Sequence, residues 1–265
     1  MHIDYREPLA DLLKPLGLPQ GSILVLHVRL KGLLESNREI TQSLKSIDYR
    51  KLSTDLLAVL NDLYKPQGIL VPTFTYSFTK TGIYDRTSTP GEVGRFGEEI
   101  RQSFPAKTRT LNPVFSLVDC DHILDGLLIS EASAFGPDSL WQRLGEIGHT
   151  CVNLNLPQPI ITTYLHYLEA QHAVPYRYPK MFTGRISADG HSWQDVNYEY
   201  YVRDLERDTR WRREKIAAFL KAHGVLQDSG TGQVPLRWFH SSGMDEILGR
   251  ALRQDPEFLI SDTPL

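Results

Sequence analysis

A histidine and a glutamate stand three positions apart in the segment Thr-Thr-Tyr-Leu-His-Tyr-Leu-Glu, residues 162–169. The segment is typical of a helix that begins after its threonines, and residues three apart in a helix lie on neighbouring parts of one face. His166 could take a proton from an amine or an alcohol, and Glu169 could orient the imidazole. Thr162 or Thr163 could cap the helix or donate to a substrate oxygen. The pattern predicts a general base, with a histidine packed on a sheet as the alternative.

His172 extends this pattern to His-x-x-Glu-x-x-His, which raises the question of a metal site. At about 100° per residue, His166 and His172 lie about 120° apart around a helix axis, whereas metal-binding pairs four residues apart are stacked on one face. We therefore expect no metal site from His166, Glu169 and His172 alone. A metal-dependent hydrolase that also uses His27 or His149 is kept as an alternative.

Three further segments place polar side chains at the ends of predicted elements. Arg29 and Lys31 follow an apolar run at residues 22–28, and they suit a phosphate or diphosphate, with surface charge as the equal alternative. Asn112 precedes a proline and could hydrogen-bond a ligand carbonyl or form an Asx-turn. Ser139 begins a predicted helix whose N-terminus could receive an anion, and an ordinary helix cap is the simpler interpretation.

The elements that must position these residues alternate between strand and helix. The apolar runs at 22–28 and 69–75 predict strands buried on both faces, and the amphipathic segment at 48–64 between them predicts a helix. Strand, helix and strand with short connections favour parallel pairing. We expect an α/β fold with a central mixed, largely parallel sheet flanked by helices, in a single domain over residues 1–265. Further elements are predicted as a helix at 92–104, a strand at 113–120, a helix at 139–147, a strand at 148–156, short aromatic-rich segments beyond 175, and helices near 211–223 and 244–254.

The composition is that of an ordinary globular chain of 265 residues, with 41% hydrophobic and 23% charged side chains. A formal net charge of −3 gives no support for a nucleic-acid or anionic membrane partner. Cys120 and Cys151 have no paired spacing, so neither a disulfide nor a thiolate metal site is expected. No apolar run approaches the roughly 20 residues that span a bilayer, and residues 1–7 lack the apolar core of a signal peptide. We expect a cytoplasmic enzyme.

Five segments, taken in order, resemble motifs of the aminoglycoside 3-N-acetyltransferase family, which transfers acetyl from acetyl-CoA to an amine. They are Leu-His-Val-Arg-Leu at 26–30, Gly-Ile-Leu-Val-Pro-Thr-Phe-Thr at 68–75, Thr-Pro-Gly-Glu-Val-Gly at 89–94, Arg-Thr-Leu-Asn-Pro-Val-Phe-Ser at 109–116, and Thr-Tyr-Leu-His-Tyr-Leu-Glu at 163–169. The resemblance extends over about residues 20–185. It implies an antibiotic N-acetyltransferase fold and acetyl-CoA as the co-substrate.

The resemblance, together with the residue patterns above, implies a set of site residues. The catalytic group is His166 as the general base, Glu169 as its partner, and Asn112 or backbone N–H groups on the oxyanion. Neither cysteine has a neighbouring base, so the amine is expected to attack the thioester directly. The residues expected to bind acetyl-CoA are His27, Arg29, Leu30, Lys31, Thr73, Ser116, Ser139 and Thr163.

Two departures from the family motifs bear on the acceptor. Asn112 stands where the family has a histidine before proline, and Val28 and Arg29 stand where it has serines. They favour an amino sugar or another small amine over an aminoglycoside. They also leave open a homologue that binds CoA without catalysis. The expected partners are thus a small amine and CoA, without nucleic acid or membrane, and assembly as a homodimer is left open.

Overall fold

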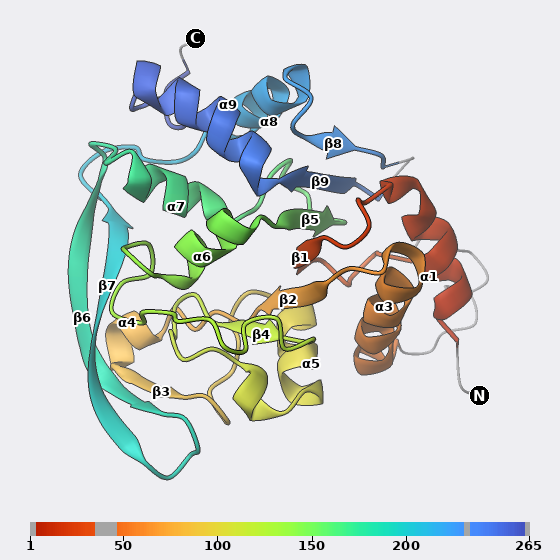
Figure 1. The fold of residues 1–265 in the computed structure, drawn as a ribbon, viewed down its shortest axis with the longest axis horizontal. Helices are drawn as coiled ribbons and strands as arrows, with labels where there is room; N and C mark the ends of the chain where they lie inside the picture. Colours follow the sequence, from red (N-terminus) through yellow and green to blue (C-terminus); the bar gives the residue numbers. More distant parts are fainter. Residues whose placement is uncertain (1–3, 35–46, 231–233, 263–265) are drawn as a thin grey trace.

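The computed structural model describes residues 4–34, 47–230 and 234–262. A six-stranded sheet lies at its centre, and β1 in the middle pairs in parallel with both β2 and β5 (Figure 1). The outer pairs are antiparallel, so parallel pairing is confined to the three central strands. This confirms the predicted α/β class with a mixed sheet. Across the sheet the strands are β4 (Leu117–Asp119), β2 (Gly68–Pro72), β1 (Ile23–Val28), β5 (Thr150–Leu154), β9 (Leu236–His240) and β8 (Gln227–Asp228).

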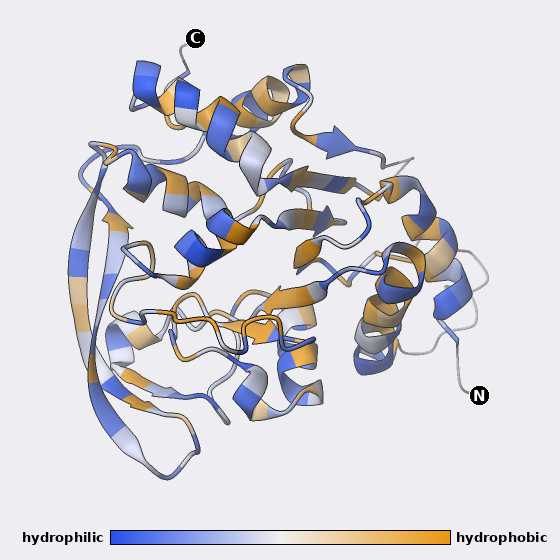
Figure 2. Ribbon diagram, viewed as in Figure 1, coloured by the Kyte–Doolittle hydropathy of each residue, from blue (hydrophilic) through white to orange (hydrophobic). Residues whose placement is uncertain are grey.

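The strands β2, β1 and β5 lie in the interior of the sheet because their sequences are near-continuous apolar runs, which suit a strand covered on both faces. Every residue of β2 and β5 is buried. Figure 2 shows hydrophobic residues concentrated on the central strands. In β1 only His27 is partly exposed, one residue before the carboxyl end of the strand. The strand therefore brings one polar side chain to the sheet edge where ligands bind in α/β folds.

Helices cover both faces of the sheet because successive side chains of a strand point to opposite faces. Leu24 and Leu26 of β1 pack on one side with α1 (Arg6–Leu13), α3 (Tyr49–Tyr64) and α5 (Arg95–Ser103). Val25 packs on the other side with four helices: α6 (Leu140–Ile147), α7 (Tyr164–Gln171), α8 (Arg213–Ala222) and α9 (Ser241–Gln254). The predicted helix at 48–64 is confirmed as α3, which Asp48 caps by accepting a hydrogen bond from the backbone N–H of Lys51.

A second sheet of three strands stands beside the first (Figure 1). β6 (Arg177–Ser187) and β7 (Trp193–Arg203) form a hairpin that stays in register over all eleven residue pairs, and β3 (Ile83–Asp85) pairs with the far end of β6. The sequence predicts only short aromatic-rich segments here. Most of β6 is exposed or half-buried, so it lacks the apolar run that marks a buried strand.

Several predicted bounds differ from the observed ones. The helix predicted from 92 begins at Arg95, and the strand predicted at 113–120 is shortened to β4, because residues 110–116 form turns. β9 is a strand that the sequence analysis does not predict. No helix in the described ranges is long and apolar enough to cross a membrane. The remaining short elements are η1 (Lys14–Leu16), α4 (Phe78–Thr81) and η2 (Ala106–Thr108).

Candidate active site

The helix that carries His166 is fixed to the end of β5 by one asparagine. Asn153 of β5 is 2% exposed, and its side-chain amide accepts from the N–H of Ile161 at 2.7 Å and donates to the carbonyl of Ile161 at 2.9 Å. Thr162 Oγ1 then accepts from the N–H of Tyr164, the first residue of α7. These bonds place the first turn of α7, with His166, at the carboxyl edge of the central strands. The sequence analysis does not single out Asn153.

Glu169 is fully buried and is held by three side chains. His166 Nδ1 lies 2.7 Å from one of its oxygens, Arg177 Nε lies 2.6 Å from the same oxygen, and Trp211 Nε1 donates to the other at 2.8 Å. The indole ring of Trp211 also lies against the imidazole, with ring centroids 4.5 Å apart. Because Nδ1 is committed to Glu169, Nε2 is the nitrogen left for a substrate. The spacing in the sequence predicts the His166–Glu169 pair, whereas Arg177 and Trp211 are missed.

The charges around this pair keep His166 neutral and Glu169 ionised. Burial lowers the pKa of His166, Glu169 opposes this, and the positive charges of Arg177 and Arg213 lower it further. Burial alone would raise the pKa of Glu169, but the hydrogen bond from His166, the charges of His166 and Arg177, and the bond from Trp211 hold it below its ordinary value. A neutral imidazole oriented by a carboxylate is the state from which a general base begins.

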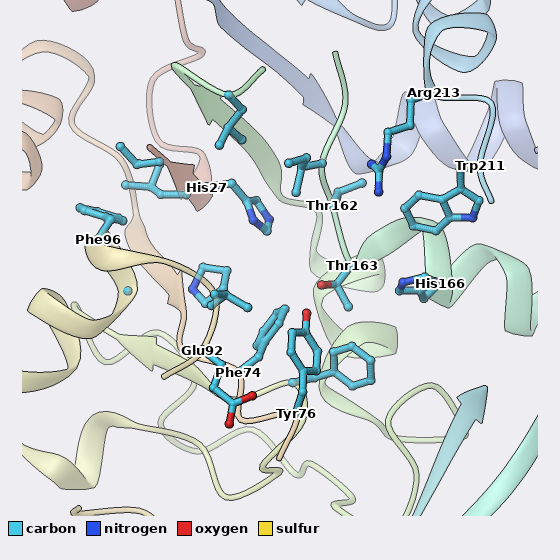
Figure 3. A pocket seen from close by; sticks show the side chains of 18 residues that line it. His27, Phe74, Tyr76, Glu92, Phe96, Thr162, Thr163, His166, Trp211 and Arg213 are labelled. Carbon is cyan, nitrogen blue, oxygen red and sulfur yellow. The ribbon is translucent and has the colours of Figure 1, made fainter. Parts of the chain in front are cut away.

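A cavity of about 440 Å³ lies at the carboxyl ends of β1 and β2, and we call it the strand-end cavity (Figure 3). Its walls are mainly apolar, and they end at the start of α7 beside His166. α5 closes one side, and it approaches β2 closely because residue 97 is glycine: a Cβ there would lie 2.3 Å from the carbonyl oxygen of Pro72. Lining side chains include His27, Phe74, Val93, Phe96, Thr163 and His166.

A second cavity of about 870 Å³ lies beside the hairpin, and we call it the hairpin cavity. It is lined by the last residues of β7, by Arg177, and by the loop before α8. The two cavities have five lining residues in common: Tyr76, Phe115, His166, Trp211 and Arg213. They therefore meet at His166, so that ligands in the two cavities would face each other across the imidazole.

The end of β1 and the loop after it carry four of the residues predicted to bind a cofactor. His27, in β1, points into the strand-end cavity (Figure 3), and its Nε2 has no hydrogen-bond partner among the described residues. Burial, with His149 adding to it, lowers the pKa of His27 to about 4. Arg29, Leu30 and Lys31, in the loop, line neither cavity; the two basic residues are exposed and Leu30 is buried.

The shape of this loop depends on Asn155, which the sequence analysis does not single out. Its backbone adopts φ 56°, and its side-chain Nδ2 donates to the carbonyl oxygens of Arg29 and Lys31, each at 2.9 Å. Asparagine tolerates the left-handed region better than most residues. The loop that carries the two basic residues is thereby fixed to the end of β5.

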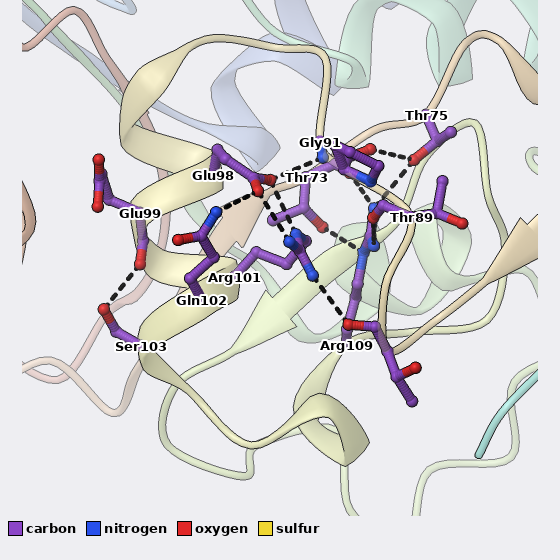
Figure 4. Close-up of polar contacts among 12 residues, drawn as sticks. Thr73, Thr75, Thr89, Gly91, Glu98, Glu99, Arg101, Gln102, Ser103 and Arg109 are labelled. Atoms are coloured by element: carbon purple, nitrogen blue, oxygen red, sulfur yellow. Dashed lines mark hydrogen bonds and ion pairs between the residues drawn. The ribbon is translucent and has the colours of Figure 1, made fainter. Parts of the chain in front are cut away.

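Thr73 and Ser116 are buried beside Arg109, and Figure 4 shows the contacts of Thr73 with this arginine. Both are fully buried, and Arg109, which is 1% exposed, donates from Nε to both of their hydroxyl groups. Arg109 also donates to the carbonyl oxygens of Thr73 and Thr89, each at 2.6 Å. Neither Thr73 nor Ser116 lines either cavity, and the arginine joins the end of β2 to the loop before α5.

Asn112 and Ser139 also lie outside both cavities. Asn112 is 6% exposed, and its Oδ1 accepts from the N–H of Phe115 at 3.3 Å and from the hydroxyl of Tyr200 at 3.2 Å. Ser139 is buried and caps α6 by accepting from the N–H of Gln142. Thr163, in contrast, lines the strand-end cavity.

The histidine pattern on α7 does not form a metal site in the described residues. No group of three His, Cys, Asp or Glu side chains in those ranges could hold a metal ion. His172 instead packs against α9, where its Nε2 would lie 3.2 Å from a Cβ built on Gly249. His166 binds Glu169 through Nδ1, whereas His172 contacts α9, so the two histidines lie in different environments.

Comparisons with known proteins give the family and the fold. A family model described as aminoglycoside 3-N-acetyltransferase matches residues 40–252. The fold is similar to that of AAC-IIIb in a binary complex with CoASH, with a TM-score of 0.68 and 17% identity over 98% of this chain and 98% of that one. A mutant of aminoglycoside acetyltransferase AAC(3)-IVa in complex with a gentamicin gives a TM-score of 0.66 and 18% identity, over 100% of this chain and 94% of that one. The YokD protein from Bacillus subtilis gives 0.67 and 17%, over 94% and 99%. No curated protein matches the sequence.

Proposed function

The chain belongs to the aminoglycoside 3-N-acetyltransferase family of CoA-dependent enzymes, and on that premise we propose that it transfers the acetyl group of acetyl-CoA to a primary amine of a small molecule such as an amino sugar or an aminoglycoside-like compound. The observation that carries the proposal is the meeting of two cavities at His166, whose Nδ1 is bound to the buried Glu169. One cavity can hold the acyl donor and the other the acceptor.

We place acetyl-CoA in the strand-end cavity. Ligands of α/β folds bind at the carboxyl ends of the strands, and the apolar walls suit the pantetheine arm. His27 Nε2, which has no hydrogen-bond partner among the described residues, can hydrogen-bond an amide of that arm. Arg29 and Lys31 line neither cavity, but they are exposed in the loop that follows the lining residue Val28, and we assign to them the positive charge that binds the phosphates. The complex of the similar AAC-IIIb with CoASH supports CoA as the donor.

The acceptor amine then lies in the hairpin cavity, within reach of His166 Nε2. An acceptor that binds as the ammonium first loses one proton to solvent, so that the neutral amine attacks. The imidazole then takes the second proton from the attacking nitrogen, and Glu169 stabilises the imidazolium. The nitrogen attacks the thioester carbon, the C–N bond forms, and the C–S bond breaks. The leaving thiolate takes up the proton from His166, which restores the neutral base.

The developing oxyanion needs hydrogen-bond donors in the strand-end cavity. The hydroxyl of Thr163 points into that cavity and makes no side-chain cap bond (Figure 3). We therefore assign this role to Thr163 and neighbouring backbone N–H groups. Asn112 lines neither cavity, and its Oδ1 accepts hydrogen bonds from Phe115 and Tyr200, so we assign it to the support of the wall instead.

The experiment that tests the proposal measures CoA release from acetyl-CoA over a panel of primary amines, for the wild type and for His166→Ala. Loss of a general base costs about 10²–10⁴ in rate. His172→Ala is the matched control, because that histidine caps the other end of the same helix and lines neither cavity. The thermal midpoint with CoA checks that each variant folds.

Each outcome has a definite meaning. A His166→Ala protein that folds, binds CoA and keeps near-normal turnover would remove His166 as the base. A wild-type protein that binds CoA but releases none from acetyl-CoA with any amine would favour a binding protein without catalysis. The intact pair of His166 and Glu169 argues for catalysis.

A further inference from the structure

The hairpin cavity has a strongly basic lining. Four arginines line it, and no aspartate or glutamate is among its described lining residues. They come from three different segments, the start of β6, the end of β7 and the loop before α8, so they surround the space rather than form one surface patch. These residues are Arg177, Arg203, Arg210 and Arg213.

Two of the four arginines already have carboxylate partners. Arg177 is paired with Glu169 at 2.6 Å, and Arg210 is paired with Asp208 at 2.8 Å. Their charges are therefore largely compensated by the protein itself. They shape the cavity wall without leaving a free positive charge in it.

The other two arginines have no carboxylate partner in the described part of the chain. Arg213 donates to the carbonyl oxygen of Ile160 at 2.5 Å and lies over the ring of Trp211, with 4.9 Å from the guanidinium carbon to the centroid. Arg203 is exposed at the end of β7 and makes no ion pair there. Arg213 lines both cavities, and Figure 3 shows it in the wall of the strand-end cavity, whereas Arg203 lines the hairpin cavity alone.

Uncompensated guanidinium groups around a cavity select the charge of its ligand. They bind carboxylates and phosphates through paired hydrogen bonds, and they repel a compound with several ammonium groups. We infer that the acceptor amine also carries a carboxylate or phosphate group, which binds between Arg203 and Arg213 while the amine reaches His166. This inference rests on the proposed acetyl transfer and narrows its substrate class.

The phosphates of CoA are a second group of anions that arginines of this site could bind. They are separated from the acceptor by place, because we assign the CoA phosphates to the loop of Arg29 and Lys31, whereas Arg203 does not line the strand-end cavity. Arg203 is therefore the residue whose replacement distinguishes the two sources. Arg213 lines both cavities and cannot do so alone.

The test measures binding of four probes to the CoA-saturated protein: inorganic phosphate, glucosamine 6-phosphate, glucosamine and gentamicin. We expect glucosamine 6-phosphate to bind about tenfold or more tightly than glucosamine, and gentamicin to bind more weakly than both. Arg203→Gln should remove most of that preference without changing the affinity for glucosamine or for CoA. Arg185→Gln is the control, because it removes the same charge from the same hairpin outside the cavity.

Four results would overturn the inference. They are equal or tighter binding of glucosamine or gentamicin, an equal effect of Arg185→Gln, weaker CoA binding by Arg203→Gln, and no binding of either anionic probe. Acetyl transfer is measured in parallel, so the two ideas fail separately. If anions bind at Arg203 but no amine gives CoA release, only the proposal of acetyl transfer is contradicted. If acetyl is transferred to amines irrespective of their charge, only the inference of an anionic acceptor is contradicted.

Discussion

Glu169 links the reacting histidine to two further residues of the cavity walls, Arg177 and Trp211. Its buried carboxylate is hydrogen-bonded to His166 and to Trp211, which lies 42 positions further along the chain, and it forms an ion pair with Arg177. Removing a charge from this group would leave another charge buried without its partner, which is costly. Arg177 and Trp211 therefore act on the reaction as positioning residues, through the orientation and charge of Glu169.

The pH dependence of acetyl transfer should report the charges around His166. Its pKa lies below the ordinary 6.5 because of burial and because of Arg177 and Arg213. Activity should be lost as pH falls through this lowered pKa, since the protonated imidazole cannot accept a proton. Arg213→Gln removes one of the positive charges, so the acidic limb of kcat/KM, which reports the free enzyme, should move to higher pH.

Arg212→Gln is the control for this pH profile. It removes the same charge from the neighbouring position, but Arg212 is paired with Asp208 and Asp262. The acidic limb of kcat/KM for Arg212→Gln should match that of the wild type. An acidic limb that does not move in Arg213→Gln, or that moves equally in both variants, would show that Arg213 does not set the pKa of His166.

Local spacing accounts for what could be predicted of single residues. His166 and Glu169 lie on one turn of a helix, so their contact follows from sequence distance alone. Arg177 and Trp211 reach the same carboxylate from other elements, and only the folded chain brings them there. Asn112 illustrates the reverse case: its motif predicts a substrate contact, while the structure places it behind Phe115 and Tyr200.

At the scale of elements, burial decides which strands the sequence reveals. β1, β2 and β5 are buried on both faces, so each required an apolar run that is visible in the sequence. β6 and β7 form one wall of the hairpin cavity while most of their residues remain accessible, and the chain needed no such run. The acceptor side of the site was therefore harder to predict than the donor side.

The contact of α5 with β2 gives a prediction for an element. Gly97→Ala would place a methyl group 2.3 Å from the carbonyl oxygen of Pro72, so the helix must move away from the strand. We expect a loss of about 1–3 kcal/mol in the free energy of unfolding and weaker CoA binding, because α5 lines the strand-end cavity. Urea denaturation and a CoA titration would measure the two effects.

A helical glycine elsewhere supplies the comparison for Gly97→Ala. In Gly243→Ala of α9, the new methyl group would contact only the side chain of Val225, at 3.2 Å. Gly243 is not a lining residue of either cavity. Gly243→Ala should leave CoA binding unchanged. Wild-type stability and CoA affinity in Gly97→Ala would mean that α5 can shift without affecting the site.

At the scale of the whole molecule, the sheet separates two hydrophobic cores and brings the site to their common edge. α1, α3 and α5 cover one core and α6 to α9 the other. The strand-end cavity draws its walls from α5 on one side and α7 on the other. We propose that residues 1–265 form a single acyltransferase domain, because both layers are needed to build one cavity.

Two histidines with lowered pKa values, the buried His149 and the partly exposed His27, should make the whole fold sensitive to acid. His149 is 1% exposed, and burial lowers its pKa to about 4, as it does that of His27. In the unfolded chain both return to the ordinary 6.5. Between these values the unfolded state binds more protons, so the free energy of unfolding is full above pH 6.5 and falls as pH drops toward about 4.

The acid dependence can be assigned to His149 by replacement. The difference between 6.5 and about 4 corresponds to roughly 3 kcal/mol for one fully buried histidine. Urea unfolding over this pH range should show a shallower fall in His149→Gln than in the wild type, because glutamine does not titrate. His191→Gln, in the exposed turn of the hairpin, should retain the wild-type slope. If the free energy of unfolding of the wild type stayed constant over this pH range, water or a proton would have to reach these histidines in the folded protein. The closed packing between β1, β5 and α6 would then have to be revised.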